Sequence, residues 1–218
     1  MIVAIDGPAG AGKSTVAKRV AEKLNYLYID TGAMYRALTL KAIEEKIEIF
    51  DTNALIGIAS TSLIDLKNNS AGEMEVYIDG RDVSSSIREP RITKLVSDIA
   101  KIKEVRDVML KLQRRLGRQR DSVLDGRDIG TVVFPDANKK FYLDAEFNER
   151  VKRRFEELKK LGQDVTMPEI EADLENRDTI DSTRKVAPLK QAKDAIYIDT
   201  TTMSVEEVVG NVLGYING

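Results

Sequence analysis

The sequence predicts an α/β protein built on a five-stranded parallel sheet. Three observations predict it: five short apolar runs, an Asp after each run, and segments of helical periodicity between the runs. The runs cover residues 2–5, 26–29, 122–124, 140–143 and 195–198. Such alternation is typical of parallel strands joined by right-handed crossovers. Because ligands bind beyond the carboxyl ends of parallel strands, we expect Asp6, Asp30 and Asp125 to lie at a binding site.

The first run leads into a glycine-rich segment that matches the phosphate-loop pattern G-x-x-x-x-G-K-[ST] in full. This segment and the Thr after it comprise Gly7, Pro8, Ala9, Gly10, Ala11, Gly12, Lys13, Ser14 and Thr15. Glycines let backbone N–H groups turn toward phosphate oxygens, and a helix that begins near Lys13 directs its positive dipole end at them. We therefore expect a bound nucleoside triphosphate, with Lys13 on its β- and γ-phosphates and Ser14 on Mg²⁺. The alternative is a turn that only links a strand to the helix at 16–24.

Composition narrows the chemistry open to this chain of 218 residues. It has no Cys and no His, which excludes disulfides, thiolate metal sites, cysteine nucleophiles and serine–histidine arrangements. Phosphoryl transfer fits this composition because it depends on positioning and charge neutralisation. A net charge of −2 argues against nucleic acid as the main partner, and no apolar window is long enough for a membrane span. We expect one domain with inserted subdomains, in the cytoplasm.

The long interval between the second and third runs predicts a small insertion. It contains a helix at 34–46, short antiparallel strands at 62–66, 73–78 and 81–83, and helices at 92–102 and 105–116. Asp79-Gly80 is typical of a tight hairpin turn. It belongs to the first of two Asp-Gly-Arg-Asp tetrapeptides, which we interpret as structural because alternating half-polar runs flank it.

The second tetrapeptide, Asp125-Gly126-Arg127-Asp128, follows a buried run beside the phosphate loop. This position favours a functional interpretation. Gly126 allows the backbone to approach a ligand closely, and Arg127 can pair with a phosphate. Asp125 or Asp128 can hold Mg²⁺ through water or accept a hydrogen bond from a base amine.

A second anion site is predicted where the second run ends. There Thr31 would cap a helix and Arg36 would supply a cation, although an ordinary capped helix is the alternative. Basic residues also cluster further along the chain. Arg150, Arg153 and Arg154 share one helical face, which is a solvated face unless the segment covers a transferring phosphate. We interpret the run Arg114-Arg115, Arg118 and Arg120 as a helix end and surface.

The order of these segments resembles the nucleoside monophosphate kinases, and among them the bacterial cytidylate kinase family. The resemblance covers essentially the whole chain, and its most specific parts are GRDIGTVVFPDA and a downstream R-x-x-x-D-x-x-R before APL. It implies phosphorylation of CMP and dCMP by ATP with Mg²⁺, by a monomer. It also implies a P-loop kinase fold with a monophosphate-binding insertion and a short helical lid. The core would comprise residues 1–30, 86–147 and 185–218, the insertion 31–85 and the lid 148–184.

The resemblance further implies which residues form the site. Gly7 to Thr15 would bind ATP, and Ser14, with Asp125 through water, would bind Mg²⁺. The implied catalytic residues are Lys13, Arg127, Arg153, Arg154 and Arg184. The implied CMP contacts are Thr31, Arg36, Ser97, Arg106, Arg127, Asp128, Arg177, Asp181 and Arg184. Among them Ser97, Arg106 and Asp128 would meet the pyrimidine, and Arg177 with Asp181 the ribose. The family commonly has Ser where this chain has Thr31, which keeps the hydroxyl.

The base assignment is chemically sound, because cytosine presents acceptors at N3 and O2 and a donor at N4, which an arginine and a carboxylate satisfy together. Other functions stay open. A phosphate-loop GTPase switch is disfavoured because its only N-K-x-D candidate, at 138–141, lacks the Asp. A non-catalytic nucleotide-binding or RNA-associated domain is a second alternative. A UMP kinase, a dTMP kinase or a kinase for a small metabolite is a third.

Overall fold

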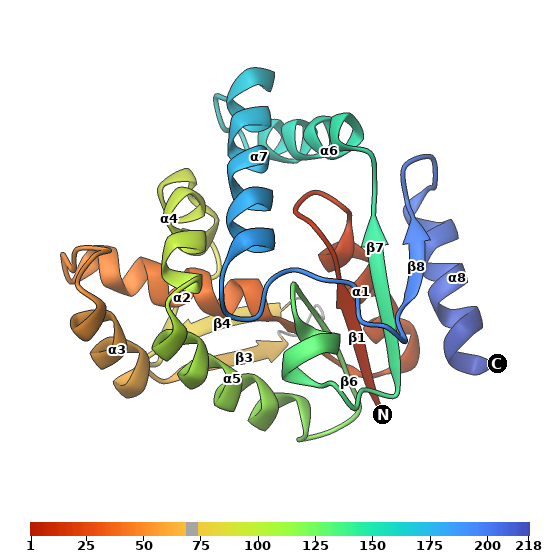
Figure 1. Cartoon of the computed structure of the whole chain (residues 1–218), viewed down its shortest axis with the longest axis horizontal. Coiled ribbons are helices and arrows are strands. Elements are labelled where there is room, and N and C mark those ends of the chain that lie inside the picture. Colours follow the sequence, from red (N-terminus) through yellow and green to blue (C-terminus); the bar gives the residue numbers. More distant parts are fainter. Residues whose placement is uncertain (69–73) are drawn as a thin grey trace.

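The computed structural model describes residues 1–68 and 74–218. A five-stranded sheet in the order β2-β6-β1-β7-β8 forms its centre, and helices cover both faces (Figure 1). The strands are β1 (Ile2–Asp6), β2 (Leu27–Asp30), β6 (Ser122–Gly126), β7 (Lys139–Asp144) and β8 (Ile196–Asp199). Every neighbouring pair is parallel, so the predicted sheet is confirmed.

The register of the sheet gathers carboxylates at one edge. Asp30 of β2 lies opposite Asp125 of β6, and Asp6 of β1 lies opposite Gly126. These residues are the last or nearly the last of their strands, as expected from the Asp that follows each apolar run. The edge beyond the strand ends is therefore the place where ligand-binding side chains meet.

Two helices cover one face of the sheet. They are α1 (Lys13–Leu24) and α8 (Val205–Asn217). Val16 of α1 and Val212 of α8 pack with Val3 and Ile5 of β1 in one buried cluster. Because both faces of β1 are covered, its sequence is a continuous apolar run rather than an alternating one.

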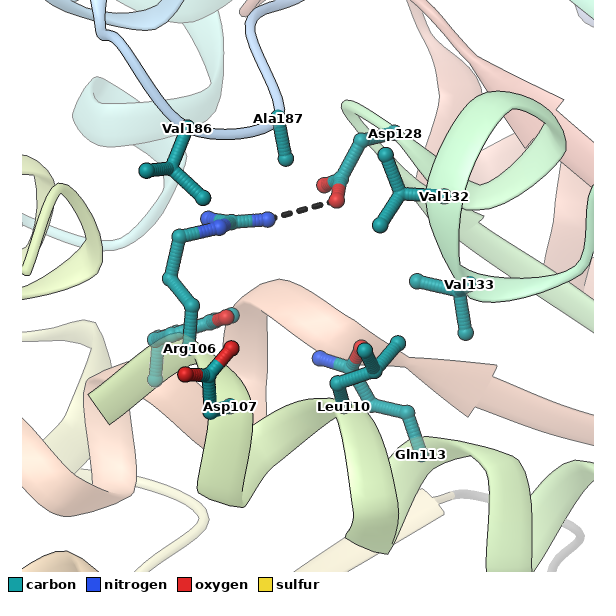
Figure 2. Close-up of a pocket in the computed structure, with 10 residues that line it drawn as sticks. Arg106, Asp107, Leu110, Gln113, Asp128, Val132, Val133, Val186 and Ala187 are labelled. Atoms are coloured by element: carbon teal, nitrogen blue, oxygen red, sulfur yellow. Dashed lines mark hydrogen bonds and ion pairs between the residues drawn. The ribbon is translucent and has the colours of Figure 1, made fainter. Parts of the chain in front are cut away.

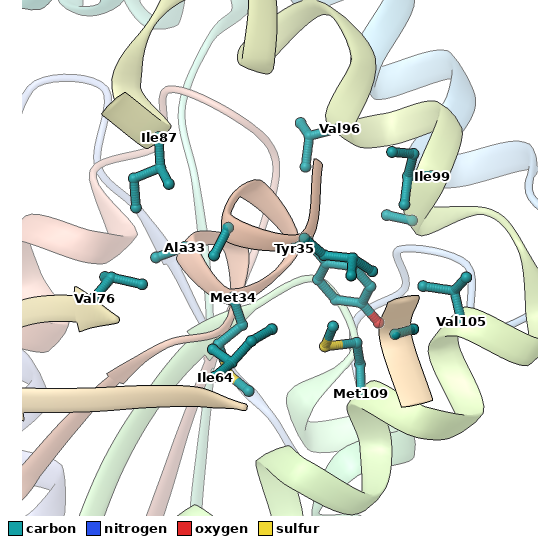
Figure 3. Close-up of a cluster of buried hydrophobic side chains, with 14 of the residues drawn as sticks. Ala33, Met34, Tyr35, Ile64, Val76, Ile87, Val96, Ile99, Val105 and Met109 are labelled. Atoms are coloured by element: carbon teal, nitrogen blue, oxygen red, sulfur yellow. The ribbon is translucent and has the colours of Figure 1, made fainter. Parts of the chain in front are cut away.

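The other face carries a larger cluster that includes the insertion. Its helices are α2 (Thr31–Glu44), α3 (Thr52–Thr61), α4 (Pro90–Ala100) and α5 (Lys103–Gly117), with the short 3₁₀ helix η1 (Ser86–Arg88). Figure 3 shows Met34 and Tyr35 of α2 packed among Ile64 and Val76 of the small sheet and Ile99 of α4. The helices predicted at 34–46, 92–102 and 105–116 are present with shifted ends. Helix α3 was not predicted.

The insertion contains a small antiparallel sheet, as predicted. Its strands are β3 (Ile64–Asn68), β4 (Met74–Ile78) and β5 (Arg81–Asp82). Asp79 and Gly80 form the turn with φ angles of 51° and 80°, and the Asp79 side chain pairs with Lys41 at 2.5 Å. The first Asp-Gly-Arg-Asp is therefore structural. Residue 73, the start of the predicted strand 73–78, lies outside the described residues.

A third cluster lies over the phosphate loop. Helices α6 (Phe147–Lys160) and α7 (Met167–Thr183) span most of the segment predicted as a lid, and Val151, Leu158, Ile170 and Leu174 of these helices pack with Ala9 of the loop. The two helices therefore lie against the phosphate loop in this structure (Figure 1).

One turn of π-helix, η2 (Ile129–Val133), follows β6 and overturns one expectation. Arg114 of α5 donates from Nε to the carbonyl of Val133 at 2.8 Å and from Nη2 to the carbonyl of Val132 at 2.9 Å. It is therefore not a simple surface residue, since it anchors this turn.

Within residues 1–68 and 74–218, none of the helices combines the length and apolarity that crossing a membrane requires.

Candidate active site

The phosphate loop links β1 to α1 through glycines that the backbone requires. Gly7 and Gly12 have φ angles of 148° and 83°, and a Cβ on Gly7 would lie 1.9 Å from the carbonyl oxygen of Leu143. The buried Lys13 donates from Nζ to the carbonyl of Pro8 at 2.6 Å. Burial, and then the charge of Arg127, lowers the pKa of Lys13 to about 7. The loop therefore holds a lysine whose charge only a strongly anionic ligand would compensate.

The two expected Mg²⁺ ligands are in contact. The Ser14 hydroxyl donates to Oδ2 of Asp125 at 2.8 Å, and the Tyr28 hydroxyl donates to Oδ1 of the same carboxylate at 2.9 Å. Burial, and then the charge of Asp30, raises the pKa of Asp125 to about 6. This oxygen-only pair suits Mg²⁺. No group of three or more acidic side chains with metal-binding spacing occurs in the described part of the chain, so the rest of the shell would come from water and phosphate oxygens.

Arg127 and Arg177 lie near Lys13 of the phosphate loop, and Arg154 lies near Arg177. Burial lowers the pKa of Lys13 most, and the charges of Arg127 and Arg177 lower it further. Burial also lowers the pKa of Arg177, to about 10, with smaller contributions from the charges of Arg127 and Arg154. The Nε atoms of Arg154 and Arg177 are buried without a hydrogen-bond partner among the described residues. Buried arginine donors without a partner, next to other cationic side chains, favour an anionic ligand with several oxygens.

Two of the three residues predicted at the base, Arg106 and Asp128, are in contact, and Arg184, which was predicted to contact phosphate, lies beside them. Arg106 of α5 donates from Nη2 to Oδ2 of Asp128 at 2.6 Å (Figure 2). Nη2 of Arg184 lies 3.3 Å from the other oxygen of Asp128. A cavity of about 30 Å³ adjoins the Arg106–Asp128 pair and is lined by residues of α5, η2 and the segment after α7. Ser97 is buried on α4. The structure thus joins Arg106 and Asp128, which lie 22 positions apart in sequence.

Asp181 of the lid is shared by two arginines. Arg127 donates from Nε to Oδ2 of Asp181 at 2.7 Å, and Arg184 lies 3.4 Å from Oδ1. Arg177, which was expected beside Asp181 at the ribose, pairs with Asp173 only at 3.8 Å. Arginines that were expected to bind phosphate are therefore paired with carboxylates of the chain itself.

The predicted cap of α2 is wrong by one residue. Asp30, not Thr31, is the N-cap, because its Oδ1 accepts the Ala33 amide at 2.8 Å. Its Oδ2 pairs with Arg36 at 2.8 Å. Thr31 is already helical, and its hydroxyl donates to the backbone carbonyl of Asp125 at 2.7 Å. Thr31 and Arg36 nevertheless lie at the strand edge, where they were expected.

Arg150, Arg153 and Arg154 of α6, which were expected to share one helical face, contact three different parts of the chain. Arg150 donates from Nη1 to the Ala9 carbonyl at 3.0 Å and to Asp178 at 2.6 Å. Arg153 donates to the carbonyl of Thr200, after β8, at 2.6 Å. The Nη1 of Arg154 pairs with Glu157 at 2.8 Å. Arg150 therefore joins the lid to the phosphate loop, and Arg154 is the lid arginine whose charge reaches Arg177.

Residues 3–218 match the family model described as cytidylate kinase. The chain belongs to the cytidylate kinase family. A curated cytidylate kinase of Desulforamulus reducens is 50% identical over 215 residues, which are 98% of this chain and 96% of the relative. The cytidylate kinase of Alkaliphilus oremlandii is 49% identical over 216 residues, or 99% and 97% of the two chains.

A solved structure of an uncharacterized protein from Eubacterium ventriosum ATCC 27560 has a TM-score of 0.53 at 12% identity, covering 100% of this chain and 98% of the other. This similarity concerns the fold alone. The family resemblance seen in the motifs is confirmed, and membership of the cytidylate kinase family decides against the GTPase and non-catalytic interpretations.

Sequence reasoning missed the roles of residues that hold this cytidylate kinase site together. The buried carboxylate of Asp6 accepts the amides of Ile129 and Gly130 at 2.8 and 2.7 Å, and burial raises the pKa of Asp6 to about 7. Tyr28 orients Asp125, as described above. The repeated Asp at strand ends was the available signal for Asp6, whereas no pattern in the sequence marks Tyr28.

Proposed function

We propose that the protein transfers the γ-phosphate of ATP to CMP and dCMP and forms CDP and dCDP. One observation carries the proposal: beside the buried Lys13 of a complete phosphate loop lies Arg177, which like Arg154 has a buried Nε without a hydrogen-bond partner among the described residues, in a chain of the cytidylate kinase family. The proposed division into core, insertion and lid follows the same resemblance. The expectations of a monomer and of a cytoplasmic location remain predictions from the sequence.

The donor side of the site would be the loop from Gly7 to Thr15. Its backbone amides and Lys13 would bind the phosphates of ATP, with Nζ exchanging the Pro8 carbonyl for β- and γ-phosphate oxygens. Ser14, and Asp125 through water, would hold Mg²⁺. When bound, the ion neutralises charge on the phosphate oxygens.

The acceptor side would be built from three groups of residues. Thr31, Arg36, Arg127 and Arg184 would face the phosphate of CMP, Ser97, Arg106 and Asp128 its base, and Arg177 with Asp181 its ribose. The contact between Arg106 and Asp128 supports the base assignment, because a guanidinium and a carboxylate side by side match the edge of cytosine.

Transfer requires no dedicated base. A phosphate oxygen of CMP is already anionic, so it forms a bond to the γ-phosphorus while the bond from that phosphorus to the β,γ-bridging oxygen breaks and ADP leaves with the electron pair. Arg127, Arg184, Arg153 and Arg154 would neutralise the charge that develops. The lid, which packs on Ala9, would exclude water as a competing acceptor.

The test is ADP release from ATP and Mg²⁺ with CMP, dCMP, UMP, AMP, GMP or dTMP offered singly. We expect strong turnover with CMP and dCMP. Uracil carries N–H at N3 and an acceptor at O4, so it would leave Arg106 and Asp128 mispaired, and turnover with UMP should fall by as much as about 10⁴-fold. Faster turnover with UMP, dTMP or another acceptor would contradict the assignment of CMP and dCMP as the substrates. No turnover with any acceptor would overturn the proposed activity.

A further inference from the structure

Asp6 physically connects the donor loop to the acceptor site. It is the last residue of β1 and directly precedes the phosphate loop. Its side chain is 3% exposed and turns to the segment after β6, where one oxygen accepts the Ile129 amide at 2.8 Å and the other accepts the Gly130 amide at 2.7 Å. A carboxylate that accepts one amide on each oxygen fixes both the position and the orientation of the backbone it holds.

The backbone held in this way carries the residues expected to contact CMP. Ile129 and Gly130 begin the η2 turn immediately after Asp128, and Arg127 precedes Ile129 by two positions. The far end of the same turn is held by Arg114 through the carbonyls of Val132 and Val133. The segment that presents Arg127 and Asp128 is therefore fixed at both ends, from two different elements.

The packing around Asp6 leaves little room for the turn to move. A Cβ on Gly130 would lie 3.4 Å from Oδ2 of Asp6 and 3.2 Å from Cδ of Lys140. A side chain on Gly130 would therefore touch the Asp6 carboxylate and crowd the Lys140 side chain. Asp128 and Lys13 are the charged groups of the site that act on Asp6, one from the turn and one from the phosphate loop.

We propose that Asp6 is a positioning residue for the acceptor nucleotide. By holding the amides of Ile129 and Gly130, it sets where Asp128 meets the cytosine and where Arg127 meets the phosphate. Asp6 would touch neither substrate, because its side chain is buried and its two oxygens face the amides of Ile129 and Gly130. This inference rests on the proposed CMP kinase function.

The test is Asp6→Asn, which preserves the size of the side chain but replaces one acceptor oxygen with a group that cannot accept an N–H. One buried amide then loses its partner and the turn shifts. We expect KM for CMP to rise about tenfold or more, while KM for ATP stays within about twofold. Asp199→Asn is the matched control, because Asp199 also ends a strand and accepts an amide, that of Thr201 at 2.9 Å, outside the acceptor site. It should leave KM for CMP unchanged.

The outcomes separate this inference from the proposed function. A wild-type protein that does not phosphorylate CMP contradicts the function itself. With an active wild type, a folded Asp6→Asn variant whose KM for CMP is unchanged, or whose two KM values rise equally, overturns the role of Asp6. Circular dichroism establishes folding. If Asp6→Asn does not fold, Asp6→Glu keeps two acceptor oxygens displaced by one methylene and should show the same selective rise. Failure of both variants to fold would assign Asp6 to the fold and would also overturn the proposal.

Discussion

At the scale of single residues, the site holds two buried ionisable groups with opposite pKa shifts. Burial lowers the pKa of Lys13 to about 7 and raises the pKa of Asp6 to about 7. In each case burial disfavours the charged form. Such shifts are typical of functional sites, where the charge serves a ligand or a positioning contact rather than stability.

Asp6 should therefore leave a pH signature on stability. Its unfolded pKa is 3.8 and its folded pKa about 7, so the stabilisation due to its protonated form is complete below pH 3.8 and is lost as the pH rises through 7. Asp6→Asn lacks this titration. The melting temperature of the wild type relative to Asp6→Asn should consequently fall by about 4 °C or more between pH 5 and pH 8, as measured by calorimetry without nucleotide.

Asp199→Asn serves as the control for this titration as well. Hydrogen bonds from Thr201, first from its side chain and then from its backbone, lower the pKa of Asp199, so its stabilising contribution is present above its unfolded pKa. The wild type should not lose stability relative to this variant over the same pH range. A constant difference between wild type and Asp6→Asn from pH 5 to pH 8 would show that Asp6 does not titrate in this range.

At the scale of elements, helix α5 illustrates what a sequence pattern leaves out. Its apolar spacing predicted a helix, and its basic end looked like surface. In the structure Arg114 is half-buried and holds the η2 turn, whereas its neighbour Arg115 is exposed. Two adjacent arginines of the same helix thus have different roles, because only one of them faces the end of β6.

We expect Arg114→Ala to lower the free energy of unfolding by about 2 kcal/mol, because the carbonyls of Val132 and Val133 lose a charged donor. Arg115→Ala is the matched control and should change it by less than about 0.5 kcal/mol. Urea denaturation of both variants measures the difference. Equal effects would mean that the turn does not depend on Arg114.

The strands could be predicted because their apolar runs are continuous, as required of strands covered on both faces. Helix α3 could not be, since its apolar residues fall in a short segment with Gly57 and several Ser and Thr side chains. The clearest sequence signal for α3 was its N-cap residue, Asp51. In the structure the Asp51 side chain accepts the Ala54 amide at 2.9 Å. The cap of α2 was placed wrongly because Asp30 and Thr31 are both good capping residues.

At the scale of the whole molecule, α6 and α7, the helices of the proposed lid, are joined to the phosphate loop by few contacts. Their cluster of buried side chains includes Ala9 of the loop, and Arg150 bridges Asp178 to the Ala9 carbonyl. The pairs Arg127–Asp181 and Arg184–Asp128 close the site further. The sequence identified these arginines as candidate site residues but not their partners, because each pair joins residues that are far apart in sequence.

We expect Asp178→Ala to loosen the lid, because it removes the carboxylate that holds Arg150 at 2.6 Å. Amide hydrogen exchange in α6 and α7 should accelerate about tenfold. Hydrolysis of ATP without an acceptor should rise relative to transfer, since water reaches the site more often. Glu175→Ala, at an exposed position of the same helix, should change neither quantity. Unchanged exchange in Asp178→Ala would show that the bridge does not hold the lid.

The strand order has a consequence for how the molecule is made. Ile2 pairs with Ser122 on one side of β1, and Val3 pairs with Lys139 on the other. At synthesis rates of about 5–20 residues per second, the first strand waits roughly 6–24 seconds for its first partner to leave the ribosome. During that time an apolar strand has no sheet to join, and pairing over such long separations is intrinsically slow. The nucleotide loop is therefore encoded first but acquires its shape among the last parts of the chain.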